Sequence, residues 1–290
     1  MIPPPFDYHS PATLGEAVAL LGQLGDEAKV LSGGQSLLPL LKLRLAYATH
    51  LVDIGRIPDL EYIREEGGWL KIGGRTRESA LDASELIRTR YPILHDTAAV
   101  IADPLVRNLA TVGSNLAHAD PANDHPATML SLGAEVVATG PGGERTIPIG
   151  DFFTDLLTTA LAHNEILTKI RIPAPAPRSG GAYVKLERKV GDFATAATAA
   201  QVTLAADGTI AKAGIGLTNA GPLPIKATAA EAYLAGKKPD AATLAEAARL
   251  AAEATDPSID RRGSIEYKRA IARVLTRRTL ERAVQQTGGN

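Results

Sequence analysis

The chain of 290 residues contains no cysteine. This absence excludes disulfide bonds, thiol redox chemistry and cysteine-ligated iron–sulfur clusters within the chain. No run of about 20 apolar residues is present, so no transmembrane helix is expected. The first residues also lack the basic and then apolar pattern of a secretion signal. We therefore expect a cytoplasmic protein, in which any electron transfer would need an organic cofactor.

Net charge and aromatic side chains are also scarce. The formal net charge is −1, and Phe, Trp and Tyr together make up 4% of the residues. Proteins that bind nucleic acid usually carry a basic patch and, for single strands, aromatic side chains on which bases stack. We therefore expect no nucleic-acid partner.

The two most common nucleotide-binding motifs are missing as well. The string G-x-G-x-x-G of a Rossmann fold does not occur. A Walker A loop also fails, because Lys238 follows Gly236-Lys237 and Glu231 stands where the first glycine belongs. A nucleotide site in this chain would therefore need another architecture.

Two short glycine-rich segments supply one. Ser32–Ser36 (SGGQS) follows an apolar stretch at 28–31, and Thr111–Asn115 (TVGSN) comes about one domain later. Glycines let backbone N–H groups turn toward one ligand, and the Ser and Thr hydroxyls add donors. Two such segments suit a ligand with two adjacent phosphates, such as a dinucleotide. Taken singly, each segment is equally well explained as an ordinary turn.

The order of four motifs carries a family resemblance. They are Pro5–Tyr8 (PFDY), Ser32–Ser36, Ala110–Asn115 with the tail Asp120–Asp124 (DPAND), and Lys185–Ala194 (KLERKVGDFA). With these motifs, the chain resembles the FAD-binding medium subunits of the molybdenum hydroxylases, the family of carbon monoxide dehydrogenase and xanthine dehydrogenase. The resemblance runs essentially from end to end.

The resemblance implies an α+β fold. A two-lobed FAD-binding domain of the vanillyl-alcohol-oxidase/PCMH type would be followed by a C-terminal domain with a three-stranded sheet and helices. We expect lobes at 1–56 and 57–172 and a C-terminal domain at 182–290. The Pro-rich stretch that ends in Gly180-Gly181 is typical of a linker and is placed at 173–181.

Local patterns predict the elements of these regions. Thr13-Leu-Gly-Glu16 forms a capping-box pattern at the start of a helix. Hairpins are expected from strands at 60–63 with 69–72 and at 135–138 with 145–147, and helices near 83–90 and 92–102. The last helix, near 264–285, is expected to bury Tyr267, Ile271, Val274 and Leu275. Its many basic residues indicate a solvated face or a contact with an acidic partner chain.

The resemblance also implies the cofactor and its contacts. FAD would be bound non-covalently, Asp124 would accept hydrogen bonds from ribose or ribityl hydroxyls, and Lys185 would stabilise the reduced anionic ring. Asp192 and Phe193 would lie near the ring. The predicted cofactor-binding residues are Lys29, Ser32, Gly33, Gly34, Gln35, Ser36, Leu37, Ile101, Ala102, Thr111, Gly113, Ser114, Asn115, Asp124, Ile166, Leu167, Lys185, Asp192 and Phe193.

Simpler explanations remain open for these residues. Asp124 could form an Asx-turn before Pro126, Lys185 and Asp192 could lie on a solvated strand edge, and Phe193 could be a core residue. The apolar members of the set are equally ordinary core residues by composition. We predict no metal site, because the spacing of His118 and His125 matches no common pattern, and no catalytic residue is predicted.

The implied function is electron transfer within a larger enzyme. A small subunit with 2Fe–2S clusters would pass electrons to FAD in this chain, and a large subunit with a molybdenum pterin cofactor would oxidise the substrate. The assembly would be a dimer of heterotrimers, a heterohexamer. Gln35 replaces a His of several carbon monoxide-type relatives, which leaves the substrate open. The alternatives are a self-contained flavoenzyme of the same fold and a nucleotide-binding scaffold subunit.

Overall fold

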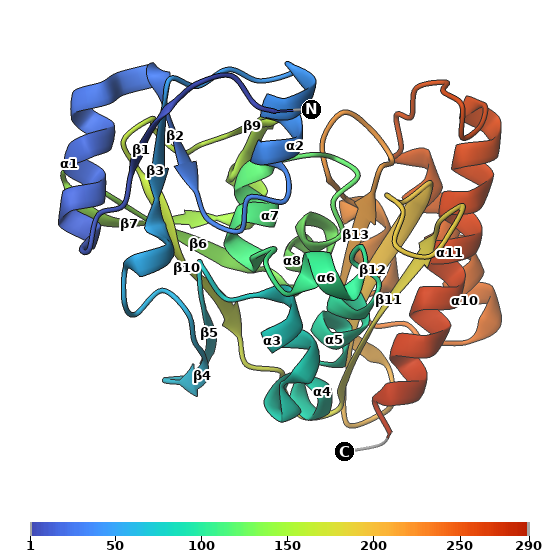
Figure 1. The fold of residues 1–290 in the computed structure, drawn as a ribbon. Coiled ribbons are helices and arrows are strands. Elements are labelled where there is room, and N and C mark those ends of the chain that lie inside the picture. The colour runs from blue at the N-terminus through green and yellow to red at the C-terminus, as the bar shows by residue number, and fades with distance from the viewer. Residues whose placement is uncertain (1, 289–290) are drawn as a thin grey trace.

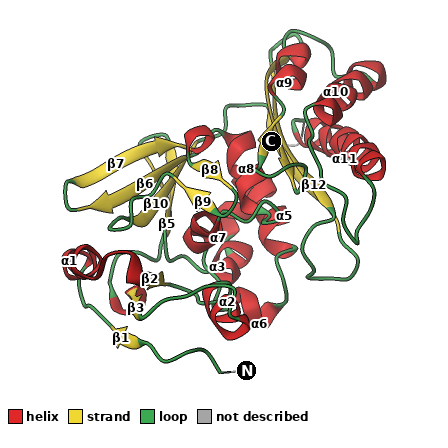
Figure 2. Cartoon of the chain, turned by 90° about the horizontal axis from the view of Figure 1, so that it is seen from above, coloured by secondary structure: helices red, strands yellow, loops and turns green. Residues whose placement is uncertain are grey.

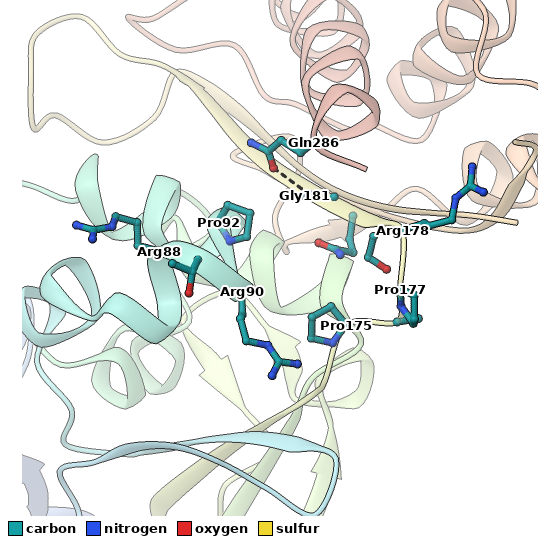
Figure 3. A pocket seen from close by; sticks show the side chains of 13 residues that line it. Arg88, Arg90, Pro92, Pro175, Pro177, Arg178, Gly181 and Gln286 are labelled. Carbon is teal, nitrogen blue, oxygen red and sulfur yellow. Dashed lines mark hydrogen bonds between the residues drawn. The ribbon is translucent and has the colours of Figure 1, made fainter. Parts of the chain in front are cut away.

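The structure, a computed structural model, describes residues 2–288. Three regions follow one another along the chain: an amino-terminal lobe, a second lobe built around a larger sheet, and a C-terminal domain (Figure 1). Seen from above, the helices α3 and α5–α8 lie between the sheets of the two ends of the chain (Figure 2). No helix within residues 2–288 is long and apolar enough to cross a membrane.

The amino-terminal lobe packs one helix on a parallel sheet of order β1-β3-β2. The capping box at Thr13 and Glu16 is confirmed: each side chain bonds to the backbone of the other residue, which satisfies two N–H groups of the first turn. Ala17 and Leu21 of the helix pack against Val52 of the sheet. The elements are β1 (Asp7–His9), α1 (Leu14–Leu24), η1 (Gly25–Glu27), β2 (Ala28–Leu31), α2 (Leu37–Leu43), β3 (His50–Asp53) and η2 (Ile54–Arg56).

The second lobe is an antiparallel sheet of order β4-β5-β10-β6-β7 covered by short helices. Its core includes the fully buried Leu70, Leu116 and Phe152. Its strands are β4 (Ile63–Glu66), β5 (Trp69–Gly73), β6 (Glu135–Gly140), β7 (Gly143–Pro148) and β10 (Ile166–Pro173), with β8 (Phe153–Asp155) and β9 (Thr158–Thr159) forming a separate pair. The helices are α3 (Glu78–Ala83), α4 (Glu85–Arg90), α5 (Pro92–Ala99), α6 (Pro104–Arg107), α7 (Val112–His118), α8 (His125–Leu132) and η3 (Ile149–Asp151).

The C-terminal domain packs helices on a sheet of order β11-β12-β13-β14. The three expected strands all form, and a two-residue strand adds a fourth. The Ala-rich helices pack Ala247, Ala251 and Ala283 into the core of this domain. The elements are β11 (Ser179–Leu186), β12 (Ala196–Leu204), β13 (Ile210–Thr218), β14 (Ile225–Lys226), α9 (Thr228–Leu234), α10 (Ala241–Glu253) and α11 (Ile265–Gln286).

The expected linker is shorter than the sequence indicates. β10 extends through Pro173 and β11 begins at Ser179, so only 174–178 lie between strands. The assignment of Gly180 and Gly181 to the linker is therefore wrong. A Cβ at Gly180 would clash with the carbonyl of Ala283, so this glycine permits close packing of the strand on α11 rather than flexibility.

The expected buried face of α11 is partly wrong. Leu275 is buried, but Tyr267 is 45% exposed and Val274 is 37% exposed. The buried face instead contains several threonines, among which Thr276 lies 3.3 Å from Thr198 of the sheet, Oγ1 to Oγ1. Because buried threonines satisfy their hydroxyls locally, an apolar pattern alone does not locate this face.

Two other boundaries differ from the expectation. The first hairpin strand begins at Ile63 rather than 60, because Leu60 packs into the core of the amino-terminal lobe. The helix expected near 92–102 ends at Ala99, and Ala102 has a positive φ of 46°. The chain leaves the helical conformation there and begins α6 after the N-cap Asp103.

Candidate FAD site

The first glycine-rich segment forms an open turn between β2 and α2. Gly34 has φ +72°, a conformation that favours glycine. Within residues 2–288, the N–H groups of Gly33, Gly34 and Gln35 have no backbone or side-chain partner. The Gln35 side chain bonds back to the Gly33 carbonyl at 3.2 Å. This turn therefore offers free backbone donors, as an anion-binding loop requires.

The second glycine-rich segment has a different construction. Gly113 N–H donates to Gly74 O at 3.1 Å and Asn115 N–H to Thr111 O at 3.0 Å. Ser114 N–H donates to Thr111 Oγ1 at 3.4 Å. A Cβ at Gly113 would clash with Gly74 O. The expectation that this glycine frees N–H groups for a ligand is therefore wrong, because the donors are used internally and the glycine permits close backbone packing.

The two segments meet side by side. Ser32 Oγ lies 3.0 Å from Thr111 Oγ1, although 79 residues separate them in the chain. Thr111 also caps α7 and donates to Ser114 Oγ at 2.8 Å. The hydroxyls of one segment thus border the free N–H groups of the other, and a single diphosphate would contact both.

An unsatisfied polar atom lies at the end of the second segment. The Asn115 side-chain oxygen is buried and has no hydrogen-bond partner within the described residues. The Asn115 carbonyl accepts from Asn123 Nδ2 at 2.8 Å, which connects this segment to the DPAND tail. An unpaired buried acceptor is costly, and the hydroxyls of a ribose or ribityl chain would satisfy it. The residues present therefore fit an FAD molecule.

Asp124 and Lys185 form a buried ion pair across the two domains. Lys185 Nζ lies 3.0 Å from Asp124 Oδ2, and the two side chains are 3% and 7% exposed. Tyr183 OH donates to Asp124 Oδ1 at 2.5 Å. The Asp124 side chain caps no N–H group, and Lys185 is not solvated. The Asx-turn explanation and the strand-edge explanation for Lys185 are therefore wrong.

The environment of this pair shifts the proton affinities. Burial raises the pKa of the Asp124 carboxyl, while the Lys185 ammonium opposes that shift. Burial and the adjacent Asp124 carboxylate raise the pKa of the Tyr183 hydroxyl. Tyr183 therefore stays protonated and donates, and both oxygens of Asp124 already have partners. Its expected contact with the cofactor remains a prediction and would use the remaining lone pairs.

The loop that carries Asp192 and Phe193 lies against the second lobe. A Cβ at Gly191 would lie 2.7 Å from Ala102 O, which shows how closely the loop approaches. Asp192 bonds to Arg188 at 3.1 Å, and Phe193 is 48% exposed. Phe193 is therefore not a core residue. Neither residue bonds to the glycine segments in the described chain, and both cofactor contacts remain predictions.

The remaining predicted residues have mixed positions. Ile101 is 7% exposed and lies beside Ala102 at the end of α5. Ile166 and Leu167 on β10 are buried in two different apolar cores. Lys29 is exposed on β2, and Leu37 is partly buried at the start of α2. All of these cofactor contacts remain predictions.

Other chemistry is poorly provided for. The described residues hold no cluster of three or more His, Cys, Asp or Glu that would bind a metal ion. His118 lies 3.9 Å from Asp120, and burial lowers its pKa. His125 is fully buried and lies 2.7 Å from Glu78. The two histidines therefore belong to separate polar contacts.

Known proteins define the class of this fold and site. Residues 4–175 match the FAD binding domain in molybdopterin dehydrogenase, and residues 181–283 match the CO dehydrogenase flavoprotein C-terminal domain. The chain therefore belongs to the family of FAD-binding medium subunits of the molybdenum hydroxylases. The two matches meet at the short linker between β10 and β11.

Individual relatives narrow the similarity. The carbon monoxide dehydrogenase medium chain of Hydrogenophaga pseudoflava is 45% identical over 98% of both chains. A subunit alpha of the 6-hydroxypseudooxynicotine dehydrogenase complex of Paenarthrobacter nicotinovorans is 36% identical over 99% of this chain and 97% of its own. A solved carbon monoxide dehydrogenase of H. pseudoflava superimposes with a TM-score of 0.95 at 47% identity, over 98% of both chains.

Several residues of the site were not expected from the sequence. Tyr183, Asn123 and Gly74 each contact a predicted residue, and Arg107 bonds to the backbone of Ile101. Asn123 lies within the quoted DPAND motif, which gave a usable signal. Tyr183 and Arg107 act through contacts that form only in the folded chain, and no local pattern marks them.

Proposed function

We propose that this chain passes electrons from iron–sulfur clusters of a partner subunit to an external acceptor. The observation that carries the proposal is the meeting of the two glycine-rich segments at Ser32 and Thr111 in a chain without cysteine. The meeting supports one dinucleotide, and the absence of cysteine means that any iron–sulfur donor lies on another chain. Bound FAD would collect single electrons and release a pair.

The residues of the chain would bind and orient this cofactor. The free N–H groups of 33–35 would hold the diphosphate, and the hydroxyls of Thr111 and Ser114 would border it. Lys185 would keep a positive charge at the floor of the site, because Asp124 and Val100 O hold its ammonium in place. A fixed cation near the ring would favour the reduced, negatively charged cofactor.

The partners follow from the family. Relatives are described as medium chains and as a subunit of a dehydrogenase complex. We propose a small partner with 2Fe–2S clusters and a large partner with a molybdenum pterin cofactor, assembled as a dimer of heterotrimers. The basic outer face of α11 suits an acidic partner surface. The cytoplasmic location stays a prediction.

Anaerobic reduction tests the proposal directly. The purified chain should retain a flavin spectrum, and acid should release all of its colour, because no cysteine is present for a thioether link. Hydroxylase substrates should leave the flavin of the isolated chain oxidised but bleach it in the co-purified complex. Bleaching without partners would favour a self-contained flavoenzyme. A chain without flavin would favour a scaffold subunit.

A further inference from the structure

Three consecutive carbonyl groups between α5 and α6 each accept a hydrogen bond from a cationic side chain. Val100 O accepts from Lys185 Nζ at 3.0 Å. Ile101 O and Ala102 O accept from Arg107 NH1 at 3.0 and 3.3 Å. The segment 100–102, here called the clamped turn, is thus fixed by one cation of its own lobe and one of the C-terminal domain.

The backbone of the clamped turn is strained. Ala102 has φ +46°, in the left-handed region that a residue with a Cβ adopts only at a cost. Such conformations persist where surrounding contacts over-determine them, and they concentrate at ligand sites. The two hydrogen bonds from Arg107 reach the carbonyls of Ile101 and Ala102, directly at the strained residue.

Arg107 is built into the fold rather than free in solvent. Its side chain is 15% exposed, and its Nε lies 3.9 Å from the Asp82 carboxylate on α3. The arginine thus belongs to α6, leans on α3 and holds the end of α5 (Figure 1). Removing it would leave two carbonyls of the clamped turn without these partners.

The clamped turn is connected to the proposed FAD site by hydrogen bonds. Lys185 joins Val100 O to Asp124, and the neighbouring Asn123 bonds to Asn115 of the second glycine-rich segment. On its other side, Gly191 packs closely on Ala102. The clamped turn therefore lies between the glycine-rich segments and the C-terminal domain.

We propose that Arg107 is a positioning residue for the cofactor. It holds the clamped turn in its strained shape, so that the turn forms one wall of the FAD site. This inference rests on the proposed function, since it assigns Arg107 a role at that same site. Arg107 would act through the turn and would not touch the cofactor.

The first experiment compares Arg107→Ala with wild type and with Arg88→Ala in the full-length chain. Arg88 is a matched control because it also lies in a short helix but pairs with Glu85 at the surface. We expect FAD binding, measured by fluorescence titration of the apoprotein, to weaken about tenfold in Arg107→Ala and to stay unchanged in Arg88→Ala. The flavin absorption maximum and midpoint potential should also shift in Arg107→Ala alone.

A second variant separates positioning from folding. Glycine adopts a positive φ without strain, so Ala102→Gly should restore most of the FAD affinity and the wild-type spectrum in the Arg107→Ala background. The same change should have little effect in wild type. A positive interaction between positions 102 and 107 in this double-mutant cycle would support the proposal.

Three results would overturn it. Equal FAD affinity, spectrum and potential in wild type and Arg107→Ala would show that the clamp is irrelevant to the cofactor. A lowered melting temperature with weak binding that Ala102→Gly does not restore would make Arg107 a folding residue. A wild-type chain that binds no FAD would overturn the proposed function itself, and the clamp proposal with it.

Discussion

The two glycine-rich segments look alike in sequence but differ in construction. In the first, the N–H groups of Gly33, Gly34 and Gln35 are free within the described chain. In the second, the N–H groups of Val112–Asn115 are all bonded internally. The first is a donor loop, whereas the second is a rigid platform that offers hydroxyls and the Asn115 amide oxygen.

Glycine serves opposite purposes in the two segments. Gly34 is needed for its positive φ, whereas Gly113 is needed because its backbone packs on Gly74. Gly33 combines both settings, since its N–H is free but a Cβ would clash with Leu109 O. A conserved chemistry of ligand binding therefore cannot be assumed from the presence of glycine, because close packing selects the same residue.

Hydrogen exchange should give the largest difference between the segments. When FAD is added at about 1,000 times its Kd, the N–H groups of 33–35 should become about 1,000-fold more protected, because the bound phosphates accept their hydrogen bonds. Those of 112–115 should already be slow without FAD. Mass spectrometry or NMR of apo and holo forms measures both. Equal protection changes in the two segments would contradict the distinction.

Alanine substitutions should separate stability from binding. Gly113→Ala should destabilise the fold by about 3 kcal/mol, because the clash is between backbone atoms. Gly34→Ala should cost only about 1 kcal/mol, since its Cβ would meet the movable Leu38 side chain at 3.1 Å. Gly34→Ala should nevertheless lose more FAD affinity than its stability change explains.

Denaturant unfolding and flavin titration of both variants test this pair. Gly15→Ala is a suitable control, because nothing lies within 4 Å of its Cβ position. If Gly34→Ala binds FAD normally and Gly113→Ala unfolds no more easily than the control, the assignment of the two roles fails.

The hydroxyl contact between the segments should have an intermediate effect. Thr111→Val removes the partner of Ser32 and Ser114 and should lower the free energy of unfolding by about 1–2 kcal/mol, with weaker FAD binding. Thr111→Ser keeps the hydroxyl and should behave nearly as wild type. Identical losses in the Val and Ser variants would show that the methyl group, not the hydroxyl, matters.

The smallest effect is expected for Asp192→Ala. Asp192 pairs with Arg188, whose side chain is 64% exposed, and exposed ion pairs contribute little to stability. The melting temperature should therefore match that of Asp207→Ala, a control in a distant turn, and FAD affinity should change less than in Gly34→Ala. A loss of FAD as large as that of Gly34→Ala would place Asp192 in direct contact with the cofactor.

The sequence by itself determined the local elements and the family. The capping box at Thr13, the strands before both glycine-rich segments and the three final helices follow from short-range patterns. The order of four motifs indicated the family, which the match over 4–175 and 181–283 confirms. These features depend on residues that are near neighbours in the chain or on their order along it.

Only the tertiary structure decided what the individual residues do. The sequence did not show that the donors of 112–115 are used internally, that Lys185 is buried against Asp124, or that Gly180 packs on α11. Each of these facts depends on a partner many residues away, and a glycine or lysine carries no local mark of such a partner. Packing of distant backbone and burial of charge, which arise only when the chain closes on itself, determined the site.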